Sequence, residues 1–458
     1  MTFDPEIAAI RFGTGLSPAL APTEGVGQML TQLQKPDNMA IRFPIGGFDQ
    51  IEQLMVETRQ LKRKQRDHPD QEQEIKKQLR MLRRKGRGWQ AEWLKATIAR
   101  GVFTEDGLRE RLALFWADHF TVKGKNGVLR NAVATYVEAA IRPHLTSRFS
   151  EMLKAATFHP MMLHYLDQIN SIGPNSLISV RKPGRGLNEN LAREVLELHT
   201  LGVGGAYTQT DVRELAKLFA GLTYRRKGGF TYAPRMAEPG PETILGKSYG
   251  GYIQDLFHVT DFLDDLAIHP DTARHLAQKL VVHFVSDVPD GALVEHIAAV
   301  YLDSGGDLMA TYKALLSHPI AWTMLAAKVK QPIGFVISAL RALDVQEQAI
   351  TGLSWKELRN LIIAPLGLMG QPWENPVGPD GWPEDTAHWI TPQGLAARIQ
   401  WAMTAPARLR PDLPDPRQFI DTALGARAGE RLRFAATAAE AKPDGIGLIL
   451  ASPEFQRS

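Results

Sequence analysis

The sequence predicts a mainly α-helical protein, as a multi-helix single domain or two helical lobes, with a charged helical hairpin and a small inserted β-hairpin. Apolar residues recur at three- and four-residue spacing along most of the 458 residues, and Gly or Pro residues separate these segments. Only the Gly- and Pro-rich stretch 228–251 shows short alternating runs, which are typical of a β-hairpin. With 44% hydrophobic residues, the chain can build a sizeable core.

The first distinct element is a charged helical hairpin over residues 48–90. Helical spacing of Leu, Met and Ile continues on both sides of the break at His68-Pro69-Asp70. Between Arg59 and Arg87, twelve Lys or Arg residues stand against four Asp or Glu residues, although the net charge of the whole chain is only +3. This run is either a solvated polar face or a surface that docks an anionic partner. Aromatic residues are nearly absent from it, which disfavours binding of nucleic acid.

Beyond the hairpin, we expect a central helical lobe over 91–225, a β-hairpin insertion over 226–256 and a C-terminal helical lobe over 257–458, within a single domain that spans 1–458. Helical periodicity marks the individual helices of both lobes. The expected helices cover residues 92–100, 106–120, 131–141, 148–156, 160–170, 188–201, 208–221, 271–285, 292–302, 307–316, 334–343, 355–369 and 391–404.

The composition excludes several classes of chemistry. The chain has no cysteine, so disulfides, thiolate metal sites and cysteine nucleophiles are absent. No uncharged stretch reaches the length of a membrane span, so we expect no transmembrane helix. The N-terminal residues show no signal peptide, which predicts a cytoplasmic protein and leaves export together with a partner open.

The helix expected at 188–201 carries an unusual polar face. At helical spacing, Asn190, Arg193, Glu194 and Glu197 share this face, and His199 lies in the opposite, apolar face. Two carboxylates three residues apart can divide the roles of general acid and base, or can bind a divalent cation through oxygen ligands. The alternative is a solvent-facing surface on which Arg193 pairs with the glutamates. His199 is either a core histidine or a further catalytic group.

Residues outside this helix complete the candidate site. Asn170, Asn175 and Ser176 lie in a loop whose short amides and hydroxyls suit hydrogen bonds to a substrate, to which Asn190 and Arg193 would add contacts. If the cofactor is a divalent cation, Asp167 and His119 join Glu194 and Glu197 as its possible ligands. The apolar residues that flank His119 suit a structural role equally well.

A Trp-rich loop over residues 370–389 is the last candidate. Trp382 and Trp389 could form a wall for a sugar ring or another flat ligand. The same side chains could instead wedge the loop into the helical core.

The segments NENLAREVLELHTLGVGGAYTQTDV, HPMMLHYLDQINSIGPNS, FWADHF and DGWP resemble a large bacterial family, domain of unknown function 1800, over nearly the whole chain. The resemblance implies an α-helical protein whose relatives are often exported and encoded beside a second uncharacterised, sulfatase-like family. This chain departs from the family pattern in showing no leader. It also has Ala237-Glu238 where relatives commonly carry a His-Asp pair, which puts any role of that pair in doubt here.

Two functions follow from these observations. The first is a hydrolase-type enzyme that acts on a polar, carbohydrate-like small molecule, with Glu194, Glu197 and His199 as catalytic residues. The second is a non-catalytic accessory protein that binds a partner encoded by a neighbouring gene through the basic hairpin or the Trp-rich loop.

Overall fold

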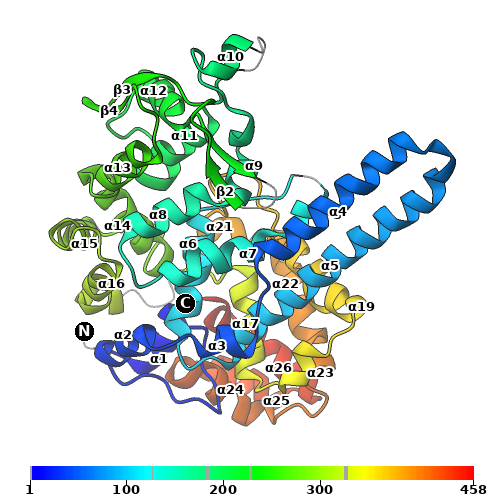
Figure 1. The fold of residues 1–458 in the computed structure, drawn as a ribbon. Coiled ribbons are helices and arrows are strands. Elements are labelled where there is room, and N and C mark those ends of the chain that lie inside the picture. The colour runs from blue at the N-terminus through cyan, green and yellow to red at the C-terminus, as the bar shows by residue number, and fades with distance from the viewer. Residues whose placement is uncertain (1–2, 126, 182–185, 226–228, 324–327) are drawn as a thin grey trace.

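The computed structural model describes residues 3–125, 127–181, 186–225, 229–323 and 328–458, and it is mainly α-helical, which confirms the predicted fold class. The chain begins with short helices that pack at one end of the molecule (Figure 1). They are α1 (Pro5–Ile7), α2 (Val26–Gln34) and α3 (Asn38–Arg42).

The charged hairpin projects from the body of the molecule (Figure 1). It consists of α4 (Phe48–Asp67) and α5 (Glu72–Phe103), which a 3₁₀ turn over Pro69–Gln71 connects. The separate helix expected at 92–100 is instead the inner part of α5. Gly86 does not break the helix, because it is buried against α4 and a Cβ there would lie 3.6 Å from the Leu54 side chain.

The central helices form the middle and one end of the molecule. Two of the expected helices, 131–141 and 188–201, continue through π-helical turns, at Val137–Ile141 after α7 and at Val195–Thr200 after α11. The helices of this region are α6 (Gly107–His119), α7 (Val133–Tyr136), α8 (Phe149–Phe158), α9 (Pro160–Tyr165), α10 (Leu177–Arg181), α11 (Asn190–Glu194) and α12 (Gln209–Phe219).

The inserted segment forms two small antiparallel hairpins where the sequence predicts one. β1 (Leu222–Arg225) pairs with β2 (Gly229–Tyr232), and β3 (Gly240–Ile244) pairs with β4 (Lys247–Gly251). Residues 226–228 of the expected insertion lie outside the described ranges. The first hairpin was missed because β1 directly follows the helical pattern of α12.

Five of the remaining helices match predicted ranges closely, namely α14 (Pro270–Phe284), α15 (Gly291–Asp303), α16 (Leu308–Ser317), α17 (Pro332–Ala342) and α22 (Pro392–Thr404). The helix expected at 355–369 consists of α19 and α20 with a π-helical turn between them. The helices are α13 (Leu256–Ala267), α14 (Pro270–Phe284), α15 (Gly291–Asp303), α16 (Leu308–Ser317), α17 (Pro332–Ala342), α18 (Glu347–Thr351), α19 (Trp355–Leu358), α20 (Ala364–Leu368), α21 (Thr386–Trp389), α22 (Pro392–Thr404), α23 (Pro406–Leu409), α24 (Pro416–Leu424), α25 (Glu430–Ala438), α26 (Lys442–Ala451) and α27 (Pro453–Gln456).

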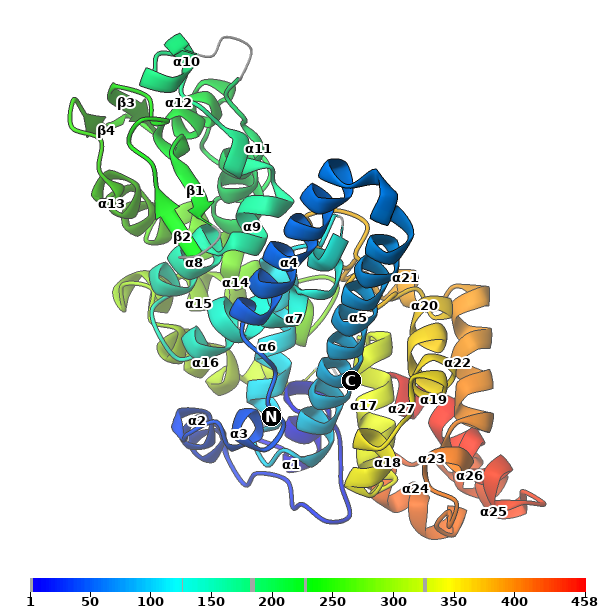
Figure 2. The same ribbon diagram turned by 45° about the vertical axis from the view of Figure 1, so that its right-hand side comes forward.

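Buried apolar side chains form two hydrophobic clusters. The first joins α6, α8, α11, α12, α13, α14 and α16. The second joins the inner part of α5 to α17, α22, α24 and α26. The C-terminal helices accordingly gather around the base of α5, whereas α10 to α13 lie at the opposite end (Figure 2). Helices from the region 257–458 thus contribute to both clusters.

Three His-Pro pairs begin helical segments in the same way. The Nδ1 atom of His159 accepts the backbone N–H of Met161 at 3.1 Å, and His269 does the same for Asp271 at 3.1 Å. His318 accepts from Ile320 at 3.4 Å. The proline supplies the fixed φ of the first helical turn, and the imidazole satisfies one of its free N–H groups. The fourth pair, at His68, makes no such bond.

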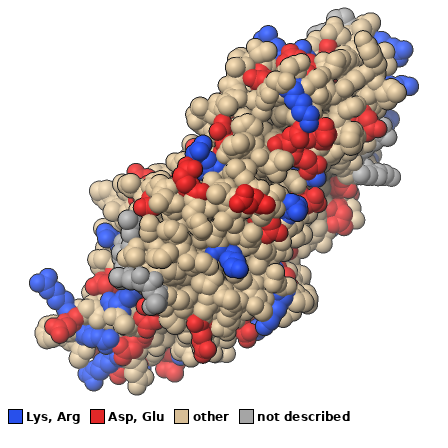
Figure 3. Space-filling view, turned by 90° about the vertical axis from the view of Figure 1, so that its left-hand side faces the viewer, with Lys and Arg blue, Asp and Glu red and all other residues tan. Residues whose placement is uncertain are grey.

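Charge is distributed unevenly over the surface. On the face formed by α13 to α16, acidic and basic side chains are interspersed (Figure 3). The basic excess lies instead on the projecting hairpin, on the other side of the molecule. Among the described residues, no helix is both long enough and apolar enough to cross a membrane.

Candidate active site

The DGWP loop, between α20 and α21, is fixed to the end of α6. The backbone N–H of Trp382 donates to Asp118 Oδ1 at 2.9 Å. Gly381 has a φ of 82°, and a Cβ at this position would lie 2.6 Å from the same oxygen. Only glycine fits such a close approach without strain. Two segments far apart in the sequence, FWADHF and DGWP, therefore meet at Asp118.

This contact places Asp380 near Glu194 of α11. Burial, followed by the negative charges of Glu197 and Asp380, raises the pKa of Glu194 to about 7, against the opposing charge of Arg193. Tyr165, at the end of α9, is the third member of the group. Burial and the charges of Glu194 and Asp380 raise the pKa of Tyr165 to about 12. Glu194, Asp380 and Tyr165 thus share one partly buried polar region.

Glu197 has a different environment from Glu194. Arg193 Nη1 lies 3.2 Å from Glu197 Oε1, and Arg193 Nη2 lies 3.5 Å from Glu189 Oε2. In the described part of the chain, no hydrogen bond or ion pair within 4.0 Å is made by Glu194. Because Arg193 pairs with Glu197 and Glu189, Glu194 is the carboxyl of this helix face that is free to exchange a proton at neutral pH.

Lys279 of α14 interacts electrostatically with Asp380. Burial lowers the pKa of Lys279, and the charges of Asp118, Glu384 and Asp380 oppose this effect. No hydrogen bond or ion pair within 4.0 Å joins the ammonium group of Lys279 to a described residue. The ammonium group is therefore available to an anionic or strongly polar group of a ligand.

A surface groove of about 640 Å³ reaches Lys279. One wall is the glycine-rich turn 201–206, and the other is α14, with Asp271, Arg274, His275 and Gln278. The turn approaches α14 so closely that a Cβ at Gly202 would lie 2.9 Å from His275 Nδ1. Glu384, which follows the DGWP loop, lines the same groove. Lys279 thus lines the groove, whereas Asp118, Asp380 and Glu194 are not among its lining residues.

The Glu384 carboxylate is held by basic side chains beneath the groove. Burial favours its neutral form, but the charge and hydrogen bond of His283 and the charges of Lys328 and Lys279 lower the pKa of Glu384 to about 2. His283 Nδ1 donates to Glu384 Oε1 at 2.7 Å. Glu384 is therefore an ionised group that does not exchange protons near neutral pH.

Three histidines lie next to one another below Lys279. His119 Nε2 donates to the backbone oxygen of His199 at 3.1 Å, and His275 Nε2 donates to that of Leu198 at 3.2 Å. Burial and the charge of Lys279 lower the pKa of His199 to about 3 and that of His275 to about 4, and they lower the pKa of His119 well below its ordinary value. All three are therefore neutral at pH 7, and their contacts hold the turn after α11 against α14.

The loop predicted to bind substrate instead contacts the β-insertion. The backbone N–H and the side-chain amide of Asn175 donate to Glu238 at 2.8 and 2.5 Å. Ser176 is buried, and its Oγ accepts from the backbone of Ser179 at 3.2 Å. Asn170 and Asn190 are exposed. Within the described ranges, no hydrogen bond or ion pair joins these residues to Glu194.

The four residues predicted as metal ligands do not gather at one point. Asp167 is exposed and pairs with Lys125 Nζ at 2.6 Å. His119 is buried, as described above, whereas Glu194 and Glu197 lie on the polar face of α11 and its π-helical turn. No group of three or more His, Asp or Glu side chains in the described ranges is arranged to hold a metal ion.

The two tryptophans of the DGWP region differ in exposure. Trp389 is 1% exposed, and its Nε1 donates to the backbone oxygen of Pro383 at 3.0 Å, so it anchors the loop in the core. Trp382 is half-buried and lines, together with Asp118, a second, mostly apolar cavity.

Sequence reasoning missed Asp118, Lys279, Asp380 and Glu384. Asp118 and Asp380 stand inside the segments FWADHF and DGWP, so their motifs were visible although their meeting was not. Lys279 and Glu384 have no local sequence signal, because their positions depend on the packing of α14 against the loop after α20.

Comparison with known proteins gives one match. The family model described as Protein of unknown function (DUF1800) matches residues 7–457. No curated protein and no solved structure matches the chain.

Proposed function

The chain belongs to the DUF1800 family of proteins of unknown function, and from this premise we propose that it is a hydrolase-type enzyme whose reacting groups are Glu194 and Asp380. The observation that carries the proposal is the partly buried Glu194 carboxyl, whose pKa is raised to about 7 by burial and by the charges of Glu197 and Asp380. A carboxyl group with a pKa near the working pH populates both protonation states, which suits a general acid and base.

In this proposal, Glu194 accepts a proton from the attacking water and returns it to the leaving oxygen of the substrate. Burial keeps the proton affinity of Glu194 high, and the negative charges of Glu197 and Asp380 add to this effect. Lys279 lies in the groove and carries no ion pair among the described residues, so its positive charge can stabilise negative charge that develops on the substrate. Tyr165 supplies a hydroxyl that stays protonated at neutral pH.

The groove supports a polar substrate. Its walls offer the backbone of the glycine-rich turn and the side chains of Asp271, Arg274 and Gln278. Such a mixture of donors and acceptors matches a hydroxyl-rich, carbohydrate-like molecule better than an apolar one.

The test replaces Glu194 and measures hydrolysis of a panel of 4-nitrophenyl glycosides, esters and phosphates. We expect Glu194→Gln to lower kcat/KM for the hydrolysed member by roughly 10²- to 10⁴-fold and to remove the transition near pH 7 from its pH profile. Glu189→Gln is the matched control, because Glu189 pairs with Arg193 and Arg213 and stands outside the pair of reacting groups. If no member is hydrolysed, or if the Glu194→Gln enzyme keeps the rate and pH profile, the proposal fails.

A second function rests on the projecting hairpin. Its basic residues are mostly exposed, and the local ion pairs Arg63–Asp67 and Lys76–Glu72 neutralise few of them. We propose as the alternative that this surface docks an acidic partner protein, such as the product of a neighbouring gene. Deletion of residues 59–87 removes the basic run and the tip of the hairpin. If that variant still binds the partner with unchanged affinity, the hairpin is not the docking surface.

A further inference from the structure

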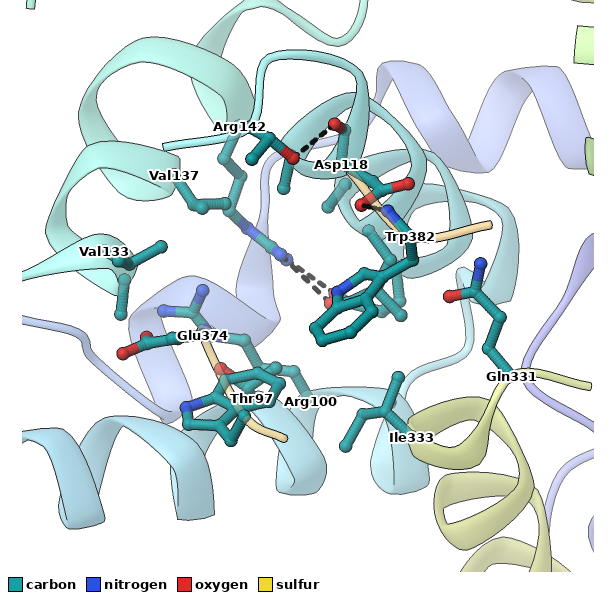
Figure 4. A pocket seen from close by; sticks show the side chains of 18 of the residues that line it. Thr97, Arg100, Asp118, Val133, Val137, Arg142, Gln331, Ile333, Glu374 and Trp382 are labelled. Carbon is teal, nitrogen blue, oxygen red and sulfur yellow. Dashed lines mark hydrogen bonds and ion pairs between the residues drawn. The ribbon is translucent and has the colours of Figure 1, made fainter. Parts of the chain in front are cut away.

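A mostly apolar cavity of about 140 Å³ lies between the two hydrophobic clusters (Figure 4). It is bounded by α5, α6, α7 and α17 and by the segment that precedes the DGWP loop. Apolar groups form most of its wall, among them Ala113, Val133, Val137, Ile333 and the indole of Trp382. The cavity is separate from the groove, and neither Glu194 nor Lys279 lines it.

The two arginines in the wall are already paired. Arg100 makes two hydrogen bonds to Glu138, at 2.5 and 3.0 Å. Arg142 makes two to Glu110, at 2.5 and 3.0 Å, and is also bonded to Asp37. An anionic ligand would lose its hydration and find no unpaired positive charge in the wall, so the cavity favours a neutral molecule over an anion.

Three residues of the wall carry polar atoms without a partner. Trp373 Nε1, Glu374 Oε1 and Gln331 Nε2 are inaccessible to solvent and form no hydrogen bond in the described part of the chain. The other carboxyl oxygen of Glu374 accepts from Gln90 at 2.8 Å. Glu374 also has a φ of 53°, which is unusual for a residue other than glycine. Unsatisfied buried groups are costly, and a ligand is one means of satisfying them.

We propose that this cavity binds one small neutral molecule, an apolar ring of about the size of phenol that carries a single hydroxyl group. The volume supports this size, because an apolar cavity of about 150 Å³ accommodates benzene. A hydroxyl group can donate to the free oxygen of Glu374 and accept from the indole of the adjacent Trp373 after small side-chain rotations. The proposal is independent of the proposed hydrolase activity.

The test measures binding of phenol, toluene and benzoate to the full chain by calorimetry, with tryptophan fluorescence as a second signal. We expect saturable binding of phenol, with toluene about tenfold weaker because it leaves the polar atoms unpaired. Benzoate should bind at least about tenfold more weakly than phenol, because its charge finds no free counter-ion.

Variants that fill the cavity locate the binding. Ala117→Leu on α6 and Val137→Phe after α7 place larger side chains in the cavity from different walls. If one variant does not fold, the other still tests where phenol binds. Each folded variant should weaken phenol binding by at least about tenfold. Ala21→Leu, at an exposed residue that lines a different pocket, should leave the affinity for phenol unchanged. The proposal is overturned if phenol does not saturate, if folded filled variants bind it as well as the parent protein, or if benzoate binds more tightly than phenol.

Discussion

At the scale of single residues, glycines allow two loops to pack closely against the helices of the candidate site. Gly381 lets the DGWP loop touch Asp118, and Gly202 lets the turn after α11 touch His275. Neither contact can be predicted from the local sequence, because each depends on a residue that lies far away in the chain. The polar face of Glu194 was predictable from helical spacing alone, whereas its raised pKa depends first on burial, then on Glu197 of the same face and on the distant Asp380.

Replacement of Gly381 by alanine should destabilise the protein. The new Cβ would meet Asp118 Oδ1 at 2.6 Å and the Asp118 backbone oxygen at 2.8 Å, at a φ that alanine rarely adopts. We expect the free energy of unfolding in urea to fall by roughly 1 to 3 kcal/mol. Gly367→Ala in α20 is the control, because no atom lies within 4 Å of its added Cβ. If both substitutions changed the free energy of unfolding equally, the close contact between Gly381 and Asp118 would not contribute to stability.

Glu374 should make stability depend on pH. Burial raises its pKa to about 7, against the hydrogen bond from Gln90. Since the folded state binds this proton more tightly than the unfolded state, the stabilisation is present at low pH and is lost as the pH rises from about 4.5 to 7. The free energy of unfolding should fall as the pH rises across this range. We expect this fall to be smaller by roughly 1 to 3 kcal/mol in Glu374→Gln than in the parent protein. An identical decline in both proteins would contradict the assignment.

At the scale of elements, helical periodicity located most helices to within a few residues. Its main error was to end a helix before residue 92, because Gly86 and Gly88 look like breakers until α4 and the core pack against α5. The π-helical turn at Val195–Thr200 is also invisible in the sequence pattern. Such turns occur often at functional sites, and this one carries Glu197 and His199.

The helix caps supplied by His-Pro pairs give a prediction at this scale. His269→Ala removes the imidazole that accepts the backbone N–H of Asp271 at the start of α14. We expect a loss of about 0.5 to 2 kcal/mol in the free energy of unfolding. His68→Ala is matched to it, since His68 also precedes a proline but caps nothing. The interpretation is wrong if both variants unfold at the same denaturant concentration.

At the scale of the whole molecule, buried arginines connect segments that the sequence separates widely. Arg341 of α17 donates to the backbone oxygens of Gly15, Val102 and Thr104, at 2.9, 2.8 and 2.8 Å. A buried arginine within an apolar helix signals a polar partner, but the sequence does not show which one. The fold class could therefore be predicted, whereas the connections between the N-terminal segment, α5 and α17 could not.

Loss of this connection should be costly. Arg341→Met leaves three backbone oxygens without their donor, and we expect the free energy of unfolding to fall by roughly 2 to 5 kcal/mol in a calorimetric or urea experiment. Arg359→Met, at an exposed position, should change it by less than about 0.5 kcal/mol. If the two variants were equally stable, the bonds of Arg341 would not hold these segments together.

The continuity of α5 has a mechanical consequence. Its 32 residues correspond to a rod of roughly 48 Å, with one end at the exposed tip of the hairpin and the other among the C-terminal helices. No break within the rod can absorb a sideways displacement of the tip. If a bound protein displaced the tip, the helix would transmit this displacement to Thr97, Arg100 and Gly101, which line the apolar cavity.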